Sequence, residues 1–317
     1  MGLPFPFDDS VVLTLFQTVE QTTESYAFFV EADYDLTDRL TLTLGGRYTE
    51  DDKTSAVVDV SMPELATLGG PDNPFSKSWD EFTPKVGLRF QATDNVMVYG
   101  LYSKGFRAGG FNGRPLGGEY EAAARPYDPE TVDNFEVGMK SEWLDGRLRF
   151  NVSAFTMEYK DKQEEQSAPA AGGTGQQTQV LNASEATING AEVDFSWLIS
   201  PYFTLDANLG WLDAEFDSLR DPVLDLDLSD LELRRAPDLT ATISPVVTVP
   251  LGRGQLIARA ALRFVDDMEL TFLNSPQSSV SSHEVLDASI TYQVGNLSIS
   301  VWGLNLTDDD SWTQSYD

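Results

Sequence analysis

The sequence predicts an all-β fold: an antiparallel, up-and-down transmembrane β-barrel, present here in part as about twelve strands of a larger barrel. Three observations support this prediction. Apolar and polar residues alternate with period two, many of these segments run to about ten residues, and short and long connections alternate between them. Period-two alternation is typical of β-strands because successive side chains point to opposite faces. About ten tilted residues are what a strand needs to cross a bilayer.

The clearest hairpin lies near the middle of the chain. On its first arm Phe135 and Val137 fall on one face and Glu136 on the other. The second arm repeats the alternation, and between the two arms stands Asp145-Gly146. These two residues readily adopt the positive φ angles that a tight hairpin turn needs. The remaining segments resemble further copies of this hairpin.

The other strands follow from the same pattern. In chain order we expect strands at residues 25–35, 40–47, 82–90, 96–106, 134–143, 148–155, at a segment ending with 191–197, and at 203–211, 239–244, 256–263, 286–293 and 297–301. We expect long loops at residues 51–80, 107–130, 160–179, 213–235 and 266–282. Outer-membrane barrels have short periplasmic turns and long extracellular loops, whereas a soluble β-sandwich has no reason to keep that order.

The facing of the side chains tests the barrel hypothesis further. Charge on the lipid face costs about 2–4 kcal/mol near the bilayer midplane. The apolar phase of several predicted strands carries no charge in mid-strand, and the charged residues fall on the opposite phase. A soluble β-sandwich that binds carbohydrate or protein would show the same alternation, so it remains an alternative. Strand length and loop order favour the barrel.

Composition excludes several classes of function. The 317 residues include no cysteine and one histidine, and the net charge is −30. Disulfides, thiolate ligands and cysteine nucleophiles are therefore excluded, and serine–histidine triads are disfavoured. Nucleic acid is an improbable partner because binding it needs cationic contacts to phosphate. No run of eighteen apolar residues predicts a transmembrane helix, and residues 1–10 do not resemble a signal peptide.

The order of turns also predicts where the chain ends lie. The first predicted strand runs into a short turn and the last one leaves a short turn, so both chain ends would lie outside the cell. Barrels of this kind normally begin and end on the periplasmic side. We therefore expect strands beyond both ends to close the barrel, unless these twelve curl upon themselves.

Four motifs, in order, carry a resemblance to a known family. They are residues 98–112 (VYGLYSKGFRAGGFN), 127–138 (YDPETVDNFEVG), 188–194 (INGAEVD) and 303–308 (GLNLTD). Together they resemble the barrels of TonB-dependent outer-membrane receptors, particularly the iron–siderophore type. The resemblance covers about residues 22–310.

The resemblance implies a fold, a location and partners. Family members have a 22-stranded barrel filled by an N-terminal plug domain, and they import scarce nutrients with energy relayed by TonB. Here it implies that residues 1–317 are a barrel fragment of a Gram-negative outer-membrane receptor, with the plug domain absent. The implied partners are a ferric siderophore or other small nutrient, outer-membrane lipid, and TonB and the plug through a missing N-terminal region.

The candidate ligand-binding residues lie where the fourth predicted strand enters a long loop. An arginine and neighbouring polar and aromatic residues at a barrel mouth could bind an anionic ferric chelate, which selects Arg107, Phe111 and Asn112. Loop packing and turn glycines are the alternative explanation. The acidic loop at 213–232 lacks the spacing of an EF-hand, and residues 172–175 lack the ending of a phosphate-binding loop.

We expect no catalytic residues, no metal site and no cofactor, and therefore a protein that is not an enzyme. The enzymatic alternative is a twelve-stranded outer-membrane hydrolase. That alternative needs a nucleophile and its base, for which a single histidine gives little support.

Overall fold

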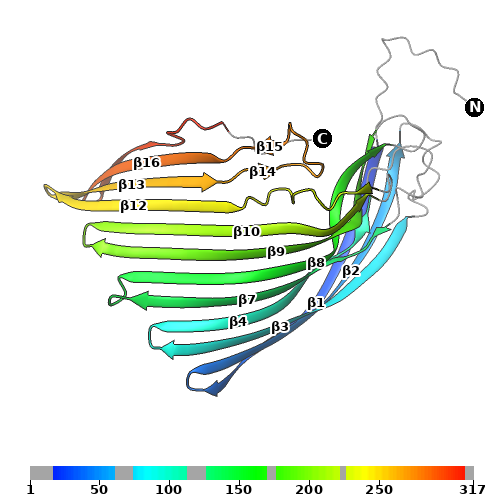
Figure 1. Cartoon of the computed structure of the whole chain (residues 1–317), viewed down its shortest axis with the longest axis horizontal. Helices are drawn as coiled ribbons and strands as arrows, with labels where there is room; N and C mark the ends of the chain where they lie inside the picture. The colour runs from blue at the N-terminus through cyan, green and yellow to red at the C-terminus, as the bar shows by residue number, and fades with distance from the viewer. Residues whose placement is uncertain (1–16, 61–73, 113–125, 170–175, 222–225, 311–317) are drawn as a thin grey trace, which may run out of the picture.

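The computed structural model describes residues 17–60, 74–112, 126–169, 176–221 and 226–310. Within these ranges, twelve strands form one curved antiparallel sheet in which each strand pairs with its neighbours along the chain (Figure 1). The described residues contain no helix that is long and apolar enough to cross a membrane. The predicted all-β, up-and-down architecture is confirmed.

The bounds of the strands are as follows. The main sheet contains, in order, β1 (Gln17–Thr37), β2 (Leu40–Val60), β3 (Phe75–Thr93), β4 (Val96–Arg107), β7 (Glu130–Trp143), β8 (Leu148–Pro169), β9 (Gln176–Ser200), β10 (Phe203–Asp221), β12 (Leu239–Leu251), β13 (Gly254–Val265), β16 (His283–Val294) and β17 (Leu297–Gly303). Two pairs of short strands lie in loops and one short strand extends the sheet: β5 (Gly110–Phe111) with β6 (Pro126–Tyr127), β14 (Met268–Glu269) with β15 (Ser279–Val280), and β11 (Leu226–Asp227) on β10.

The short turns gather at one end of the sheet, which we call the turn end, and the long connections at the other, the loop end (Figure 1). The predicted Asp145-Gly146 turn is confirmed, with φ angles of 55° and 79°. Gly252 and Gly295 supply positive φ in two other turns. Glycine adopts this conformation at little cost, which explains its place in these short connections.

The strands are longer than predicted at the loop end. β1 begins at Gln17 instead of residue 25, and β8 and β9 pair through most of the connection that we expected to be a loop. The glycine-rich tip at residues 172–175 lies outside the described residues. Beyond the bilayer both faces of a strand can be polar, so the alternation disappears from the sequence. Hydrogen bonding between neighbouring backbones still continues there.

Residues of one phase form a continuous apolar face across the sheet. One in-register row of this face contains Leu88, Gly100, Val137, Ala154, Ala191, Trp211 and Leu239. The side chain of Val137 is 62% exposed, although it lies in the middle of the sheet. This face has the composition that a wall in contact with hydrocarbon requires.

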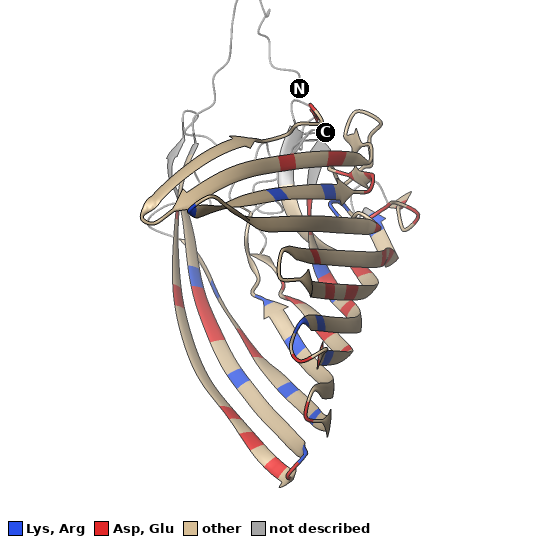
Figure 2. Ribbon diagram, turned by 90° about the vertical axis from the view of Figure 1, so that its left-hand side faces the viewer, with Lys and Arg blue, Asp and Glu red and all other residues tan. Residues whose placement is uncertain are grey.

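The opposite phase forms a polar face. One of its rows contains Lys140, Asn151, Asp194, Asn208, Thr242 and Arg263. Asp194 accepts hydrogen bonds from Asn151 at 3.2 Å and from Asn208 at 2.8 Å. A hollow of about 490 Å³ lies over this row. Acidic residues outnumber basic ones by 51 to 21, and Figure 2 shows both kinds spread along the strands.

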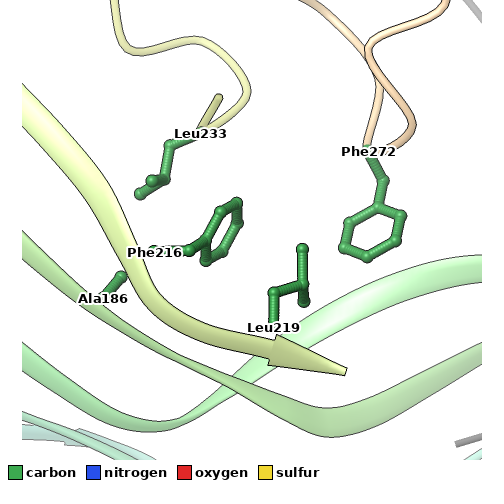
Figure 3. Close-up of a cluster of buried hydrophobic side chains, with 5 residues drawn as sticks. All are labelled: Ala186, Phe216, Leu219, Leu233 and Phe272. Carbon is green, nitrogen blue, oxygen red and sulfur yellow. The ribbon is translucent and has the colours of Figure 1, made fainter. Parts of the chain in front are cut away.

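A small hydrophobic core lies at the loop end. It consists of Ala186, Phe216, Leu219, Leu233 and Phe272. Figure 3 shows Phe216 and Leu219 of β10 pointing toward residues of two loops. Those loops are tied down by backbone bonds, including one from the Leu228 amide to the Leu219 carbonyl at 2.8 Å. The core therefore folds the connections after β10 and β13 back onto the sheet.

Candidate functional site

The candidate site is built on the segment that leaves β4 at the loop end. We call residues 107–112 and 126–130 the strap. The strap includes the two-stranded pairing of β5 with β6. It contacts β2 and β3 on one side and β8 and β9 on the other, although β4 and β7 separate these pairs in the sheet. The strap therefore ties together parts of the wall that are not neighbours.

An aromatic contact joins the strap to β3. The ring of Phe111 lies 5.8 Å from that of Trp79 in an edge-on arrangement and 6.0 Å from that of Phe75 in a stacked one. Trp79 and Phe111 are both buried, at 5% and 7% exposure. Burial of two large rings is a major stabilising contribution for a loop segment.

Lysines reinforce the same side of the strap. The Nζ of Lys53 donates to the Gly109 carbonyl oxygen at 2.6 Å, and Lys77 forms an ion pair with Asp128 at 2.8 Å. Both ammonium groups lie over the Trp79 ring, at 5.7 Å and 5.2 Å from its centroid. The strap is thus held to β2 and β3 by aromatic packing and by cationic contacts.

Two consecutive glycines allow this close approach. A Cβ atom on Gly109 would lie 2.5 Å from Nε1 of Trp79, and one on Gly110 would lie 2.4 Å from the Tyr127 hydroxyl. No side chain fits at such distances without movement of its neighbours. The Gly-Gly pair of the 98–112 motif therefore has a packing role.

Side-chain amides hold the other side of the strap. Asn112 exchanges two hydrogen bonds with the Val180 backbone, at 3.2 Å and 2.7 Å, as a strand residue would. Gln163, which is 5% exposed, donates from Nε2 toward the carbonyl oxygens of Ala108 at 3.1 Å and Asp128 at 3.0 Å. These bonds place β8 and β9 against the strap.

Asn182 completes this side. Its Oδ1 accepts from the Asp128 amide at 2.7 Å, and its Nδ2 donates to the Asp128 carbonyl at 2.7 Å. Local irregularity brings Gln163 and Asn182 to this position: the ladder between β8 and β9 shifts register around Lys162, and Asp161 has a φ of +52°. Such bulges redirect side chains at the rims of barrels.

The structure brings the three predicted site residues together in the strap, but only one is open. Phe111 is buried, and both atoms of the Asn112 amide bond to Val180. The side chain of Arg107 is 67% exposed and lies 3.9 Å from Glu130. Ligand binding by these residues stays a prediction, and the geometry makes Arg107 the residue best placed to meet a ligand.

The surroundings of the strap alter two pKa values. Burial lowers the pKa of Lys53 below its ordinary value, Asp51 acts in the opposite direction, and Arg107 lowers it further. Burial raises the pKa of Tyr127, while Arg107 acts against that rise. Arg107 therefore acts on both groups, while the carboxylates of Glu130 and Asp128 pair with Arg107 and Lys77.

Sequence reasoning missed Trp79, Lys53, Gln163 and Asn182. Trp79, Lys53 and Gln163 lie in stretches that were expected to be long loops, and Asn182 lies just after one of them. Gln163 stands 55 residues from the carbonyl it binds at Ala108. No local pattern signals such contacts. In the part of the chain that the structure describes, no group of three or more histidine, cysteine, aspartate or glutamate residues is placed to hold a metal ion.

The family profile described as "TonB dependent receptor-like, beta-barrel" matches residues 4–306. The chain belongs to this family. The pesticin receptor of Yersinia enterocolitica is 27% identical over 318 residues, covering 98% of this chain and 43% of that protein. The ferripyoverdine receptor of Pseudomonas aeruginosa is 26% identical over 193 residues, covering 60% of this chain and 21% of that protein.

Solved structures agree on the fold. The ferric yersiniabactin uptake receptor from Yersinia pestis superposes with a TM-score of 0.78 at 24% identity, covering 96% of this chain and 43% of that one. This TonB-dependent receptor chain thus spans less than half the length of these relatives. Receptors of the family lie in the outer membrane of Gram-negative bacteria, which places the apolar face in lipid.

Proposed function

We propose that this chain forms part of the wall of a receptor that takes up a ferric siderophore, or a similar scarce nutrient, with energy supplied through TonB. Its relatives are named as receptors, and two of them as receptors for pesticin and ferripyoverdine. Uptake by the complete gene product would also use a plug domain and TonB. We expect binding and transport rather than catalysis, because the relatives are named as receptors.

The observation that carries this proposal is the position of Arg107. Its side chain is 67% exposed and meets Glu130 only at 3.9 Å, whereas Phe111 is buried and the Asn112 amide is bonded to Val180. The strap lies at the loop end, which faces the outside of the cell in barrels of this kind. An exposed guanidinium is suited to the carboxylate or catecholate oxygens of an anionic chelate.

The test uses the complete gene product in its outer membrane. We expect Arg107→Ala to weaken binding of the ferric ligand about tenfold, since a hydrogen bond to a charged group contributes roughly 1.5–3 kcal/mol. Arg253→Ala, which removes an exposed arginine at the turn end, is the matched control. Equal binding by both variants and the wild type would remove Arg107 from the site. Failure of the wild type to support iron-limited growth would contradict siderophore uptake.

A further inference from the structure

The apolar face carries a hollow of about 560 Å³ in the middle of the sheet. Four strands, β3, β4, β7 and β8, line this hollow. The residues that shape it are Leu88, Gly100, Tyr102, Phe135, Val137 and Ala154. Almost all of its lining is apolar, as expected of a surface that contacts hydrocarbon.

Small residues create the hollow. Leu88, Gly100, Val137 and Ala154 lie opposite one another in a single row. Gly100 has no side chain, and a Cβ built there would meet its nearest neighbours only at 4.0 Å. Ala154 contributes a single methyl group. The row therefore has two depressions, at Gly100 and at Ala154, and the larger side chain of Val137 lies between them.

Two aromatic rings form the upper wall of the hollow. Tyr102 and Phe135 are cross-strand partners in the next row, and their ring centroids lie 4.9 Å apart. The Tyr102 hydroxyl donates to Asp133 at 2.8 Å, which holds its ring in place. The hollow is thus an open depression of the sheet surface that paired rings bound on one side.

The hollow lies at the boundary of the uncharged band. Toward the turn end, the apolar phase of these four strands carries no charged residue. One row beyond the rings, about 7 Å further along each strand, stand Lys104, Asp133 and Glu158. This is the level at which the acyl chains of outer-leaflet lipids meet their headgroups.

The charges above the hollow differ from those elsewhere at this level. On β1, β2, β10 and β16, which do not line the hollow, the first charged residue beyond the apolar band is acidic; these residues are Glu24, Glu50, Asp213 and Glu284. Above the hollow two lysines join the carboxylates. Lys104 is paired with Glu81 at 2.6 Å. Lys160 is 56% exposed and contacts Asp133 at 3.3 Å, so it keeps donors that face outward.

We propose that the hollow binds one acyl chain of an anionic membrane lipid whose phosphate is held by Lys160. An acyl chain matches the apolar lining, and the aromatic wall ends where the headgroup begins. A lipid phosphate would accept from the free donors of Lys160, and a headgroup with a net negative charge is attracted to this lysine without the opposing cation that a zwitterionic headgroup carries. This inference concerns the outer surface and does not depend on which nutrient the receptor takes up.

The experiment measures which lipid stays with the complete gene product. The protein is placed in nanodiscs of phosphatidylcholine doped with phosphatidylglycerol of the same chain length, and retained lipid is counted by native mass spectrometry after release. We expect the wild type to retain phosphatidylglycerol preferentially. Gly100→Leu and Ala154→Leu fill the hollow from its two depressions and should each reduce retention about tenfold.

Two further variants separate the parts of the proposal. Lys160→Gln should remove the preference for phosphatidylglycerol over phosphatidylcholine while a chain is still retained. Ala207→Leu adds the same bulk to the apolar face on β10, away from the hollow, and should behave as the wild type. The proposal is overturned if the wild type shows no preference, or if either filled variant that assembles retains lipid as the wild type does.

Discussion

Trp79 shows how a single residue both stabilises the strap and costs it free energy. Its ring contacts Phe111 and lies beneath two lysine ammonium groups. Its Nε1, however, is buried with no hydrogen-bond partner in the described part of the chain, because it is pressed against Gly109. An unpaired buried donor costs about 1–3 kcal/mol, which offsets part of the gain from packing.

This balance predicts losses of different size for two substitutions at Trp79. Trp79→Phe keeps an aromatic ring and removes the unpaired donor, so we expect the free energy of unfolding to change by less than about 1 kcal/mol. Trp79→Ala removes the packing and should destabilise the loop end by about 3–5 kcal/mol. Chemical denaturation of the complete gene product, with hydrogen exchange at residues 107–112, measures both. If both variants lost the same free energy of unfolding, the indole nitrogen would have to make an essential contact.

Tyr127 predicts how the strap responds to alkaline pH. Burial raises the pKa of its phenol above the ordinary value of 10.0. A group with a raised pKa in the folded state stabilises that state below its unfolded pKa, and this contribution is lost as pH rises through the folded pKa. We therefore expect the strap to loosen above about pH 10.

Tyrosinate absorbance and proteolysis of the strap test this response. Subtracting the absorbance titration of Tyr127→Phe from that of the wild type isolates one phenol, which should titrate above 10.0. The variant should lose the part of the alkaline sensitivity that Tyr127 causes. A Tyr127 phenol that titrates at or below its ordinary value would contradict the burial that the structure shows.

At the scale of elements, the strap depends on amide side chains supplied by distant strands. Gln163 serves several strap carbonyl oxygens from one buried nitrogen. Gln163→Leu has nearly the same size but leaves those acceptors without their donor, so we expect it to destabilise the closed strap by about 1–3 kcal/mol. Faster hydrogen exchange at residues 107–112 and 126–130 is the expected readout.

The matched control for this variant lies at the turn end. Gln255 donates to Gln293 at 3.1 Å in an exposed position, so Gln255→Leu removes an amide bond without touching the strap. It should leave strap exchange unchanged. If Gln163→Leu exchanges no faster than this control, the amide contacts do not hold the strap.

The sequence allowed the membrane-crossing elements to be predicted but not their extensions. Phe135 and Val137 alternate with polar residues because one face meets lipid, so the strand can be recognised there. Beyond Glu158 on β8 both faces meet polar surroundings, and the only remaining signal is backbone pairing, which the sequence does not encode locally. The candidate site likewise contains one residue that the sequence signals and others that it does not. Arg107 lies in a recognisable motif, whereas Gln163 reaches it only through the fold.

At the scale of the whole molecule, the two faces of the sheet explain its location. In the membrane-crossing part of the sheet, rows of apolar side chains lie on one face, and the rows between them place charged or amide side chains on the other face. Composition alone did not distinguish this arrangement from a soluble sandwich, because the average over two faces is similar in both. The order of short and long connections distinguished the barrel from the sandwich.

Charge placed on one face should therefore cost more than charge placed on the other. Leu209 lies on the apolar face, and its neighbour Asn208 lines the polar hollow. We expect Leu209→Arg to destabilise the barrel in membranes by about 2–4 kcal/mol and Asn208→Arg to cost far less. Folding into lipid vesicles under denaturant titration measures the difference. Equal costs would contradict the assignment of faces.

The most direct test is a spin-label scan along residues 205–211 of β10 in the complete gene product, reconstituted in lipid bilayers. The central claim is that alternate side chains of these strands meet hydrocarbon and a wet interior. The account predicts that labels at Leu205, Ala207, Leu209 and Trp211 are accessible to oxygen and shielded from a polar relaxation agent, with the pattern reversed at Asp206, Asn208 and Gly210. A scan without period-two alternation, or with the two sets exchanged, would contradict it.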